Sequence, residues 1–85
     1  LVRIHATLDQ VDPIGRTGSH VAIRLRTEDA SLRAIWFNAS EWLPRLARGR
    51  RVRVLGVPRE NRFRGSVTAE LEVKDLALIA ESEPC

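Results

Sequence analysis

The sequence feature that most restricts the fold is a short helix predicted between two strands. Residues 32–65 read LRAIWFNASEWLPRLARGRRVRVLGVPRENRFRG. Residues 32–37 and 51–57 are rich in side chains that favour strands, while the apolar residues between them have helical spacing. Because the rest of the chain reads as strands and turns, a helix at this point limits the domain to few types of barrel.

The predicted helix has start and stop signals and one residue that opposes it. Asn38 and Ser40 are both good N-cap residues, and Asn38 with Glu41 has the spacing of a capping box. Pro44 lacks an N–H and its ring opposes an uninterrupted turn, so we expect a short or two-part helix that ends at Gly49. Its apolar face consists of Trp42, Leu43 and Leu46.

The other segments alternate between strands and turns. Residues 2–8, 21–26 and 67–74 alternate apolar and polar side chains, as half-buried strands do. Residues 12–19 contain a proline and two glycines and are predicted to form a loop, and Pro58 is expected to stop the fourth strand or place it at an edge. The shorter segments are two turns at 27–31 and 60–65, residues 76–79 that continue the fifth strand or cross the barrel, and a tail or linker at 81–85.

The third strand has two readings of its alternation. Either Leu32, Ala34 and Trp36 face inward, or Ile35 and Phe37 do. A bulge would let both sets be partly buried.

Five strands with a helix between the third and the fourth predict a mainly β OB-fold barrel over residues 1–80. An SH3-like barrel has similar content but no helix at that place. OB-folds usually hold oligonucleotides or oligosaccharides on the face of strands two and three and on the flanking loops.

The length of 85 residues allows one domain with a modest core. Cys85 is the only cysteine, which excludes an internal disulfide and a multi-cysteine metal site. Without a charged-then-apolar leader or a long apolar run, neither secretion nor a membrane partner is expected. The single cysteine fits a reducing, cytoplasmic setting, and the chain, which begins at Leu1, resembles a piece of a longer protein.

Charge is unevenly distributed along the chain. Residues 1–65 contain 13 arginines and six acids, whereas residues 66–85 contain Lys74 and five acids. A GC-rich genome would explain the preference for arginine but not this clustering. We therefore predict one face that binds a polyanion.

The candidate binding residues lie on the predicted face of strands two and three and on its flanking loops. Cationic grooves that follow phosphates and aromatic side chains that stack on bases are the two requirements for binding single strands. The candidates are Arg16, His20, Arg24, Arg26, Arg33, Arg59, Arg62, Phe63 and Arg64.

Each candidate also has a purely structural interpretation. Arginines that alternate along a strand are commonly a solvated face, and Phe63 could fold over the barrel mouth instead of stacking on a base. Trp42 and Trp36 are expected in the core. His5 and His20 lack a third ligand at suitable spacing, so no metal site is predicted.

No nucleophile with a base, paired catalytic carboxylates or phosphate-binding glycine loop can be assembled from these residues. We therefore predict no catalytic residue and no cofactor, and interpret the chain as a binding module.

The chain resembles the OB domain of the RecJ family of single-strand-specific DNA exonucleases. The resemblance lies in SLRAIWFN, a short helix ending in LARG, RRVRVLGVPRENRFRG and LEVKDL, over roughly residues 20–78. The matched residues are Phe37, Gly49, Asn61, Phe63, Gly65, Asp75 and Leu76.

The resemblance implies a role in DNA repair and recombination, with single-stranded DNA as the partner. RecJ-like enzymes degrade strands from the 5′ end with divalent metal ions held in separate catalytic domains, which would be further partners of this domain. Two alternatives stay open: an OB module that docks onto a protein or another domain of its own chain, and an RNA-binding OB domain of the tRNA type.

Overall fold

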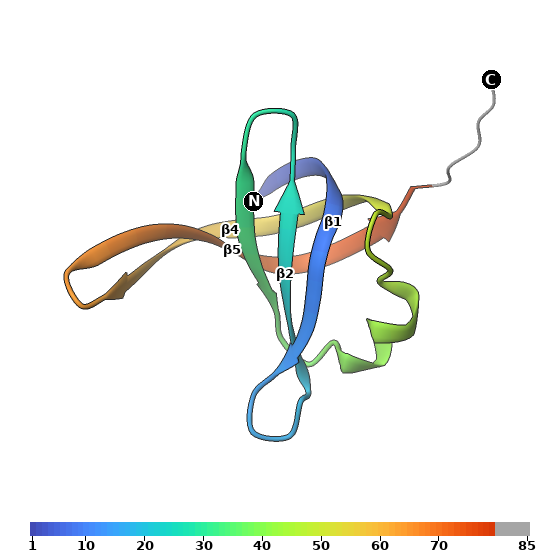
Figure 1. The fold of residues 1–85 in the computed structure, drawn as a ribbon, viewed down its shortest axis with the longest axis horizontal. Coiled ribbons are helices and arrows are strands. Elements are labelled where there is room, and N and C mark those ends of the chain that lie inside the picture. Colours follow the sequence, from blue (N-terminus) through green and yellow to red (C-terminus); the bar gives the residue numbers. More distant parts are fainter. Residues whose placement is uncertain (80–85) are drawn as a thin grey trace.

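The chain folds as a closed five-stranded barrel with the strand order β1-β2-β3-β5-β4 (Figure 1). The computed structural model describes residues 1–79, with the side chains of Asn61 and Phe63 left out. Its elements are β1 (Val2–Ile14), β2 (His20–Arg26), β3 (Ser31–Trp36), the 3₁₀ helix η1 (Ser40–Arg45), β4 (Arg51–Phe63) and β5 (Ser66–Leu78). The predicted OB-fold, with its helix between the third and fourth strands, is confirmed.

Strand β1 is longer than the sequence predicted and serves two neighbours. Its first half pairs with β4 and its second half with β2, with a register shift between Leu8 and Gln10. The predicted loop at 12–19 is therefore wrong over its first three residues, because Pro13 still pairs with Val21 at the end of the ladder. Only Gly15 and the residues after it form the turn.

The helix is shorter than predicted and of a different type. Pro44 lies inside η1, and i+3 bonds such as Trp42 N–H to the Ala39 carbonyl (2.9 Å) replace the α-helical pattern. The predicted caps are wrong, since Ala39 is the N-cap and no side chain caps the helix. Gly49 does not end the helix: its backbone, at φ 89°, donates to the Leu8 carbonyl and leads into β4.

The alternation of β3 has a single phase. Ala34 is fully buried, with Leu32 and Trp36 partly buried on the same side. Strands β2 and β3 pair without a register shift, so of the two readings the structure has the first, without the bulge that would reconcile them. The register shifts lie in β1 and, between Leu55 and Gly56, in β4.

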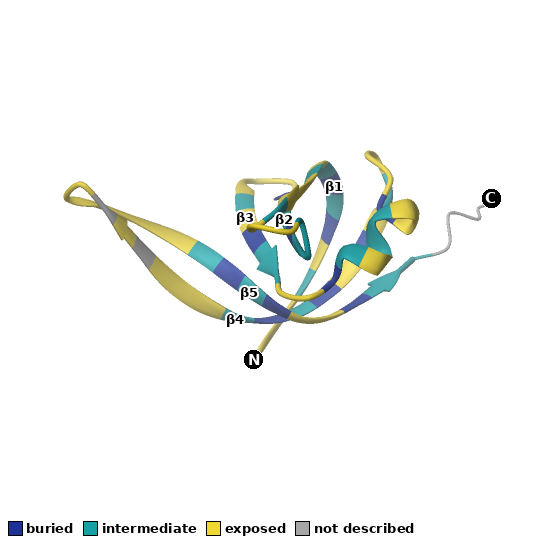
Figure 2. Cartoon of the chain, turned by 90° about the horizontal axis from the view of Figure 1, so that it is seen from below, coloured by how far each residue is buried: buried dark blue, intermediate teal, exposed yellow. Residues whose placement is uncertain are grey.

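Strands β4 and β5 continue beyond the barrel as a two-stranded arm (Figure 1). Pro58 does not stop β4: it lies beyond Gly56, the last residue of β4 that pairs with β1, so its missing N–H breaks no bond to that strand. The arm ends at Arg64 and Gly65, whose φ angles of 51° and 80° fit a two-residue type I′ hairpin turn. Figure 2 shows that the outer part of the arm is exposed.

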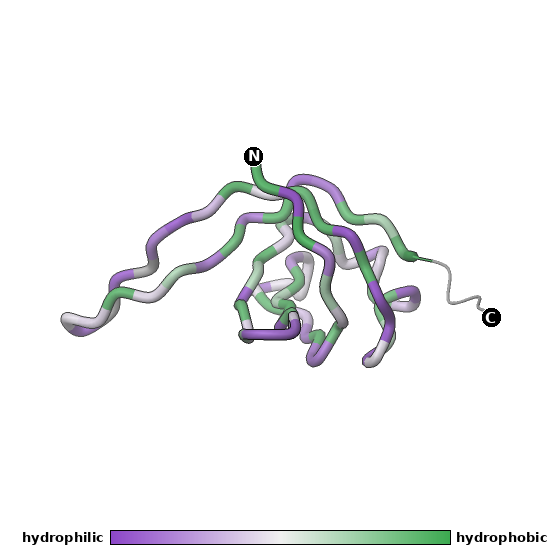
Figure 3. The backbone as a smooth tube through the Cα atoms, turned by 90° about the horizontal axis from the view of Figure 1, so that it is seen from above, coloured by the Kyte–Doolittle hydropathy of each residue, from purple (hydrophilic) through white to green (hydrophobic). Residues whose placement is uncertain are grey.

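The core lies where all five strands meet. Its fully buried side chains come from alternate positions, as the alternating hydropathy along the strands in Figure 3 illustrates. The helix segment closes one end with buried Ala39 and Leu46, while Trp36 and Trp42 pack against the core with ring centroids 5.0 Å apart. Within residues 1–79, no helix has the length and apolar character needed to cross a membrane.

Gly56 marks the point at which β4 leaves the barrel and begins the arm. A Cβ built on it would lie 2.6 Å from the Glu72 carbonyl oxygen and 2.8 Å from Leu71 Cγ. We predict that Gly56→Ala lowers the free energy of unfolding by about 1–3 kcal/mol, because backbone at this position must move. Urea denaturation followed by circular dichroism measures the change. Ser66→Thr, which adds a methyl group at an exposed strand position, is the control, and equal stability of wild type and Gly56→Ala would contradict the prediction.

Candidate nucleic-acid interface

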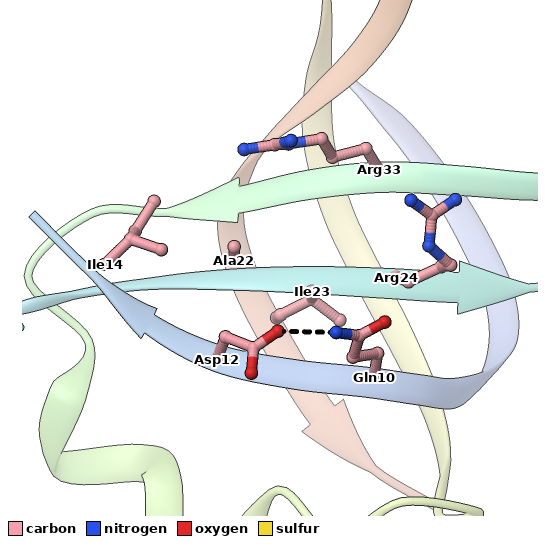
Figure 4. A pocket seen from close by; sticks show the side chains of 7 residues that line it. All are labelled: Gln10, Asp12, Ile14, Ala22, Ile23, Arg24 and Arg33. Carbon is pink, nitrogen blue, oxygen red and sulfur yellow. Dashed lines mark hydrogen bonds between the residues drawn. The ribbon is translucent and has the colours of Figure 1, made fainter.

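An open pocket lies on the outer surface of β1, β2 and β3 (Figure 4). Apart from Ile23, which is buried in the core, the lining side chains lie on the outer face of the sheet, which fixes their spacing. The lining residues are Gln10, Asp12, Ile14, Ala22, Ile23, Arg24 and Arg33.

Two arginines face each other across this surface. Arg24 of β2 and Arg33 of β3 are directly paired in the ladder, a position in which like charges repel. Arg33 is compensated by Glu70 of β5, with Nε and Oε2 3.3 Å apart. Arg24 is exposed and has no ion pair within residues 1–79. An anion bound at Arg24 would relieve the repulsion.

The opposite rim of the pocket is formed by Gln10 and Asp12 of β1, which the sequence prediction placed outside the site. The Gln10 side-chain amide donates to an Asp12 carboxylate oxygen at 2.9 Å, as Figure 4 shows. An amide and a carboxylate offer donors and acceptors of the kind that read base edges. One side of the pocket is therefore cationic, and the opposite side carries a neutral amide and a carboxylate.

Most of the other predicted arginines are paired with carboxylates. Arg26 lies 3.6 Å from Asp9, Arg59 lies 2.8 Å from Glu72, and Arg62 lies 3.3 Å from Glu60. Arg64 in the turn is also engaged in an interaction, while exposed Arg16 lies in the loop before β2. Two acids of β5, Glu70 and Glu72, pair with Arg33 of β3 and Arg59 of β4, because β5 lies between these strands.

Glu72 is the centre of the strongest of these ion pairs. Its carboxylate accepts from Lys74 at 2.9 Å and from Arg59 at 2.8 Å. The hydrogen bond from Lys74, aided by the charges of both cations, holds the pKa of Glu72 below its ordinary value of 4.5. The Arg59 side chain is thus held across the β4–β5 ladder by Glu72.

The side chain of His20, the first residue of β2, is fixed by two contacts with the segment that follows β3. Its Nδ1 accepts a hydrogen bond from the Asn38 backbone N–H at 2.9 Å, and its ring meets that of Phe37 edge-on, with centroids 5.2 Å apart. Asn38 has a left-handed backbone at φ 57°, which asparagine tolerates well. His20 therefore positions the segment that follows β3.

Phe37 is the aromatic residue that sequence reasoning missed. It is 45 % exposed at the end of β3, whereas Trp36 and Trp42 pack against the core as predicted. The signal was the strand phase: once Ala34 faces inward, Phe37 must face outward. The Phe63 side chain lies outside the described part of the structure, so its stacking role stays a prediction.

A barrel of this topology, with polar and cationic groups on the β1–β3 surface, belongs to the OB class of nucleic-acid-binding modules. The family model of the RecJ OB domain matches residues 1–75. The chain therefore belongs to the RecJ family of OB domains, as its motifs had indicated.

Solved structures with similar folds include two aspartyl-tRNA synthetases. One comes from Leishmania major, where it is assigned as an aspartyl-tRNA synthetase. It has a TM-score of 0.72 and 19% sequence identity, and the match covers 96% of this chain and 18% of that one. The other, from Entamoeba histolytica, has a TM-score of 0.74 and 16% identity over 99% of this chain and 19% of its own. At such identities the similarity establishes the fold alone. A search of curated proteins finds no match.

No group of three or more His, Cys, Asp or Glu side chains could hold a metal ion in the part of the chain that the structure describes.

We predict that the ion pairs of Glu72 contribute stability above pH 4.5 that is lost as the pH falls below it. A carboxylate with a lowered pKa stabilises the folded state when ionised, and its protonation removes that contribution. The melting temperature of Glu72→Gln should therefore lie below that of the wild type at neutral pH and approach it in acid. Glu28→Gln removes the same charge from the β2–β3 turn and controls for net charge. A difference that widens in acid would contradict the assignment.

Proposed function

We propose that this domain binds single-stranded DNA for a RecJ-like 5′-3′ exonuclease that acts in DNA repair and recombination. The observation that carries the proposal is the Arg24–Arg33 pair beside Gln10 and Asp12, on the surface that OB-folds use for oligonucleotides. The family match supports the identity of the parent enzyme.

In this proposal the domain grips the strand and other domains of the parent cleave it. Arg24 and Arg33 contact phosphates, while Gln10 and Asp12 contact base edges or bridging water. Divalent metal ions and the hydrolytic groups belong to the catalytic domains, which are then partners of this domain within one chain. The ion pairs of Arg26, Arg59 and Arg62 reduce the charge available for phosphate, so the grip is moderate rather than strong.

The first test is the salt dependence of binding to a labelled single strand. With about four phosphates engaged, the slope of log K against log salt should be near −3, because each phosphate on a single strand contributes about −0.7. Fluorescence anisotropy measures it. Measurable affinity with a flat salt response would contradict the proposal.

The second test removes the uncompensated cation. Arg24→Gln should weaken binding about tenfold at low salt and reduce the magnitude of the slope by about 0.7, because one charged contact is lost. Arg53→Gln is the matched control: Arg53 is also an exposed strand arginine, but it lies on β4 and pairs with His5 of β1. Equal losses in both variants would show a response to net charge and not to this surface.

The two alternatives give different results in the same assay. Competition between DNA and RNA strands of matched sequence identifies an RNA-binding domain if RNA wins. No binding of either strand at low salt, with retention of the parent's other domains, identifies a docking module.

A further inference from the structure

We propose that Phe37 is the floor of a second pocket, which receives one unpaired base and favours bases with an exocyclic amino group. This inference deepens the proposed function and rests on it. Neither the sequence patterns nor the family match assigns a ligand to Phe37.

The pocket lies between the end of β3 and the base of the arm. Ile35 of β3 and Phe37, the residue after this strand, form one side, and Arg59 and Glu60 of β4 with Glu70 and Glu72 of β5 form the other. Ile35 and Phe37 alternate with the inward-facing residues of β3, so both present apolar surface outside the core. An exposed aromatic ring in a hollow of this kind provides a stacking surface for a base.

The Phe37 ring is held in place before any ligand arrives. His20 meets it at an interplanar angle of 75°, and the Asn38 N–H fixes the imidazole through Nδ1. Gly15 also lies against His20, since a Cβ built on it would come within 2.9 Å of Cδ2. A ring fixed in this way loses little side-chain entropy on stacking.

The charges around the pocket favour a base over a phosphate. Three of its lining residues are glutamates and one is an arginine, and that arginine is bound to Glu72. A phosphate there would face carboxylates. A neutral base is not repelled, and its amino group can donate to them.

The two pockets are joined by a single ion pair. Arg33 lines the pocket over β1–β3, and its partner Glu70 lines the Phe37 pocket. Arg33 and Ile35 are two residues apart on β3, which is about 7 Å along a strand. A strand whose phosphate meets Arg24 and Arg33 can therefore place a neighbouring base on Phe37.

The preference for an amino group follows from the acceptors. Ionised Glu60 and Glu70, each already engaged by an arginine, only accept hydrogen bonds, and a carboxylate has about four lone-pair sites. Cytosine and adenine donate from an amino group, whereas thymine has no amino group and offers only its N3–H, which lies between two carbonyl oxygens that repel a carboxylate.

The test compares oligo(dC) with oligo(dT) of equal length at neutral pH, by anisotropy with this domain. The wild type should bind oligo(dC) about tenfold more tightly. Phe37→Leu should weaken binding to both about tenfold, because stacking is lost while an apolar side chain remains. Val2→Ala, at an exposed apolar position of β1, is the control. A large fall in melting temperature with unchanged binding would make Phe37 a packing residue and overturn the proposal.

Substituting the glutamates should raise affinity where substituting Phe37 lowers it. Glu70→Gln removes the partner of Arg33, so affinity for oligo(dT) should rise while the preference for oligo(dC) falls to about twofold or less. Glu60→Gln should also reduce the preference. Equal binding of both oligomers by the wild type, or a preference unchanged in both variants, would overturn this pocket and leave the proposed function standing. No binding of either oligomer would overturn the proposed function and the pocket together.

Discussion

The short parallel contact between β3 and β5 is the constraint on which the rest of the structure depends. It joins only residues 33–35 to residues 70–72, yet it closes the barrel. It also fixes the electrostatics, because it brings Glu70 beside Arg33 and leaves Glu72 beside Arg59 of β4. The same three pairs thus set the shape of the core, the compensation of the arginines and the position of the hollow beside Phe37.

Compensation is graded across the surface. Near the arm, Arg59 and Arg62 are paired with the carboxylates of Glu72 and Glu60. Their positive charge is therefore partly neutralised, and uncharged ligand groups fit the surface there. Over β1 and β2 the charge of Arg24 is left uncompensated opposite Arg33. Exposed ion pairs contribute little to stability, so this gradient affects which ligand groups lie where much more than it affects folding.

The sequence predicted the five strands of the barrel and the place of the helix, because alternation and one helical segment are local signals. It failed where a residue's effect depends on a distant neighbour. The sequence left open whether Pro58 stops β4 or places it at an edge, and only the pairing of β4 with β1 and β5 decides for the edge. Asn38 has the residue type of an N-cap, yet Ala39 occupies that position and no side chain caps the helix. The net charge of each segment does not reveal that Arg33 pairs with Glu70. The exposure of Phe37 could not be inferred either until it was known which residues of β3 face inward.

The position of the hollow at the base of the arm has a consequence for sequence variation. Glu70 and Glu72, which line the hollow, lie in the part of β5 that pairs with both β3 and β4, so this wall belongs to the closed barrel. The described residues of the ribbon beyond Glu60 and Glu70 are not part of the lining. The outer ribbon can therefore change in sequence without altering the wall that a ligand would meet.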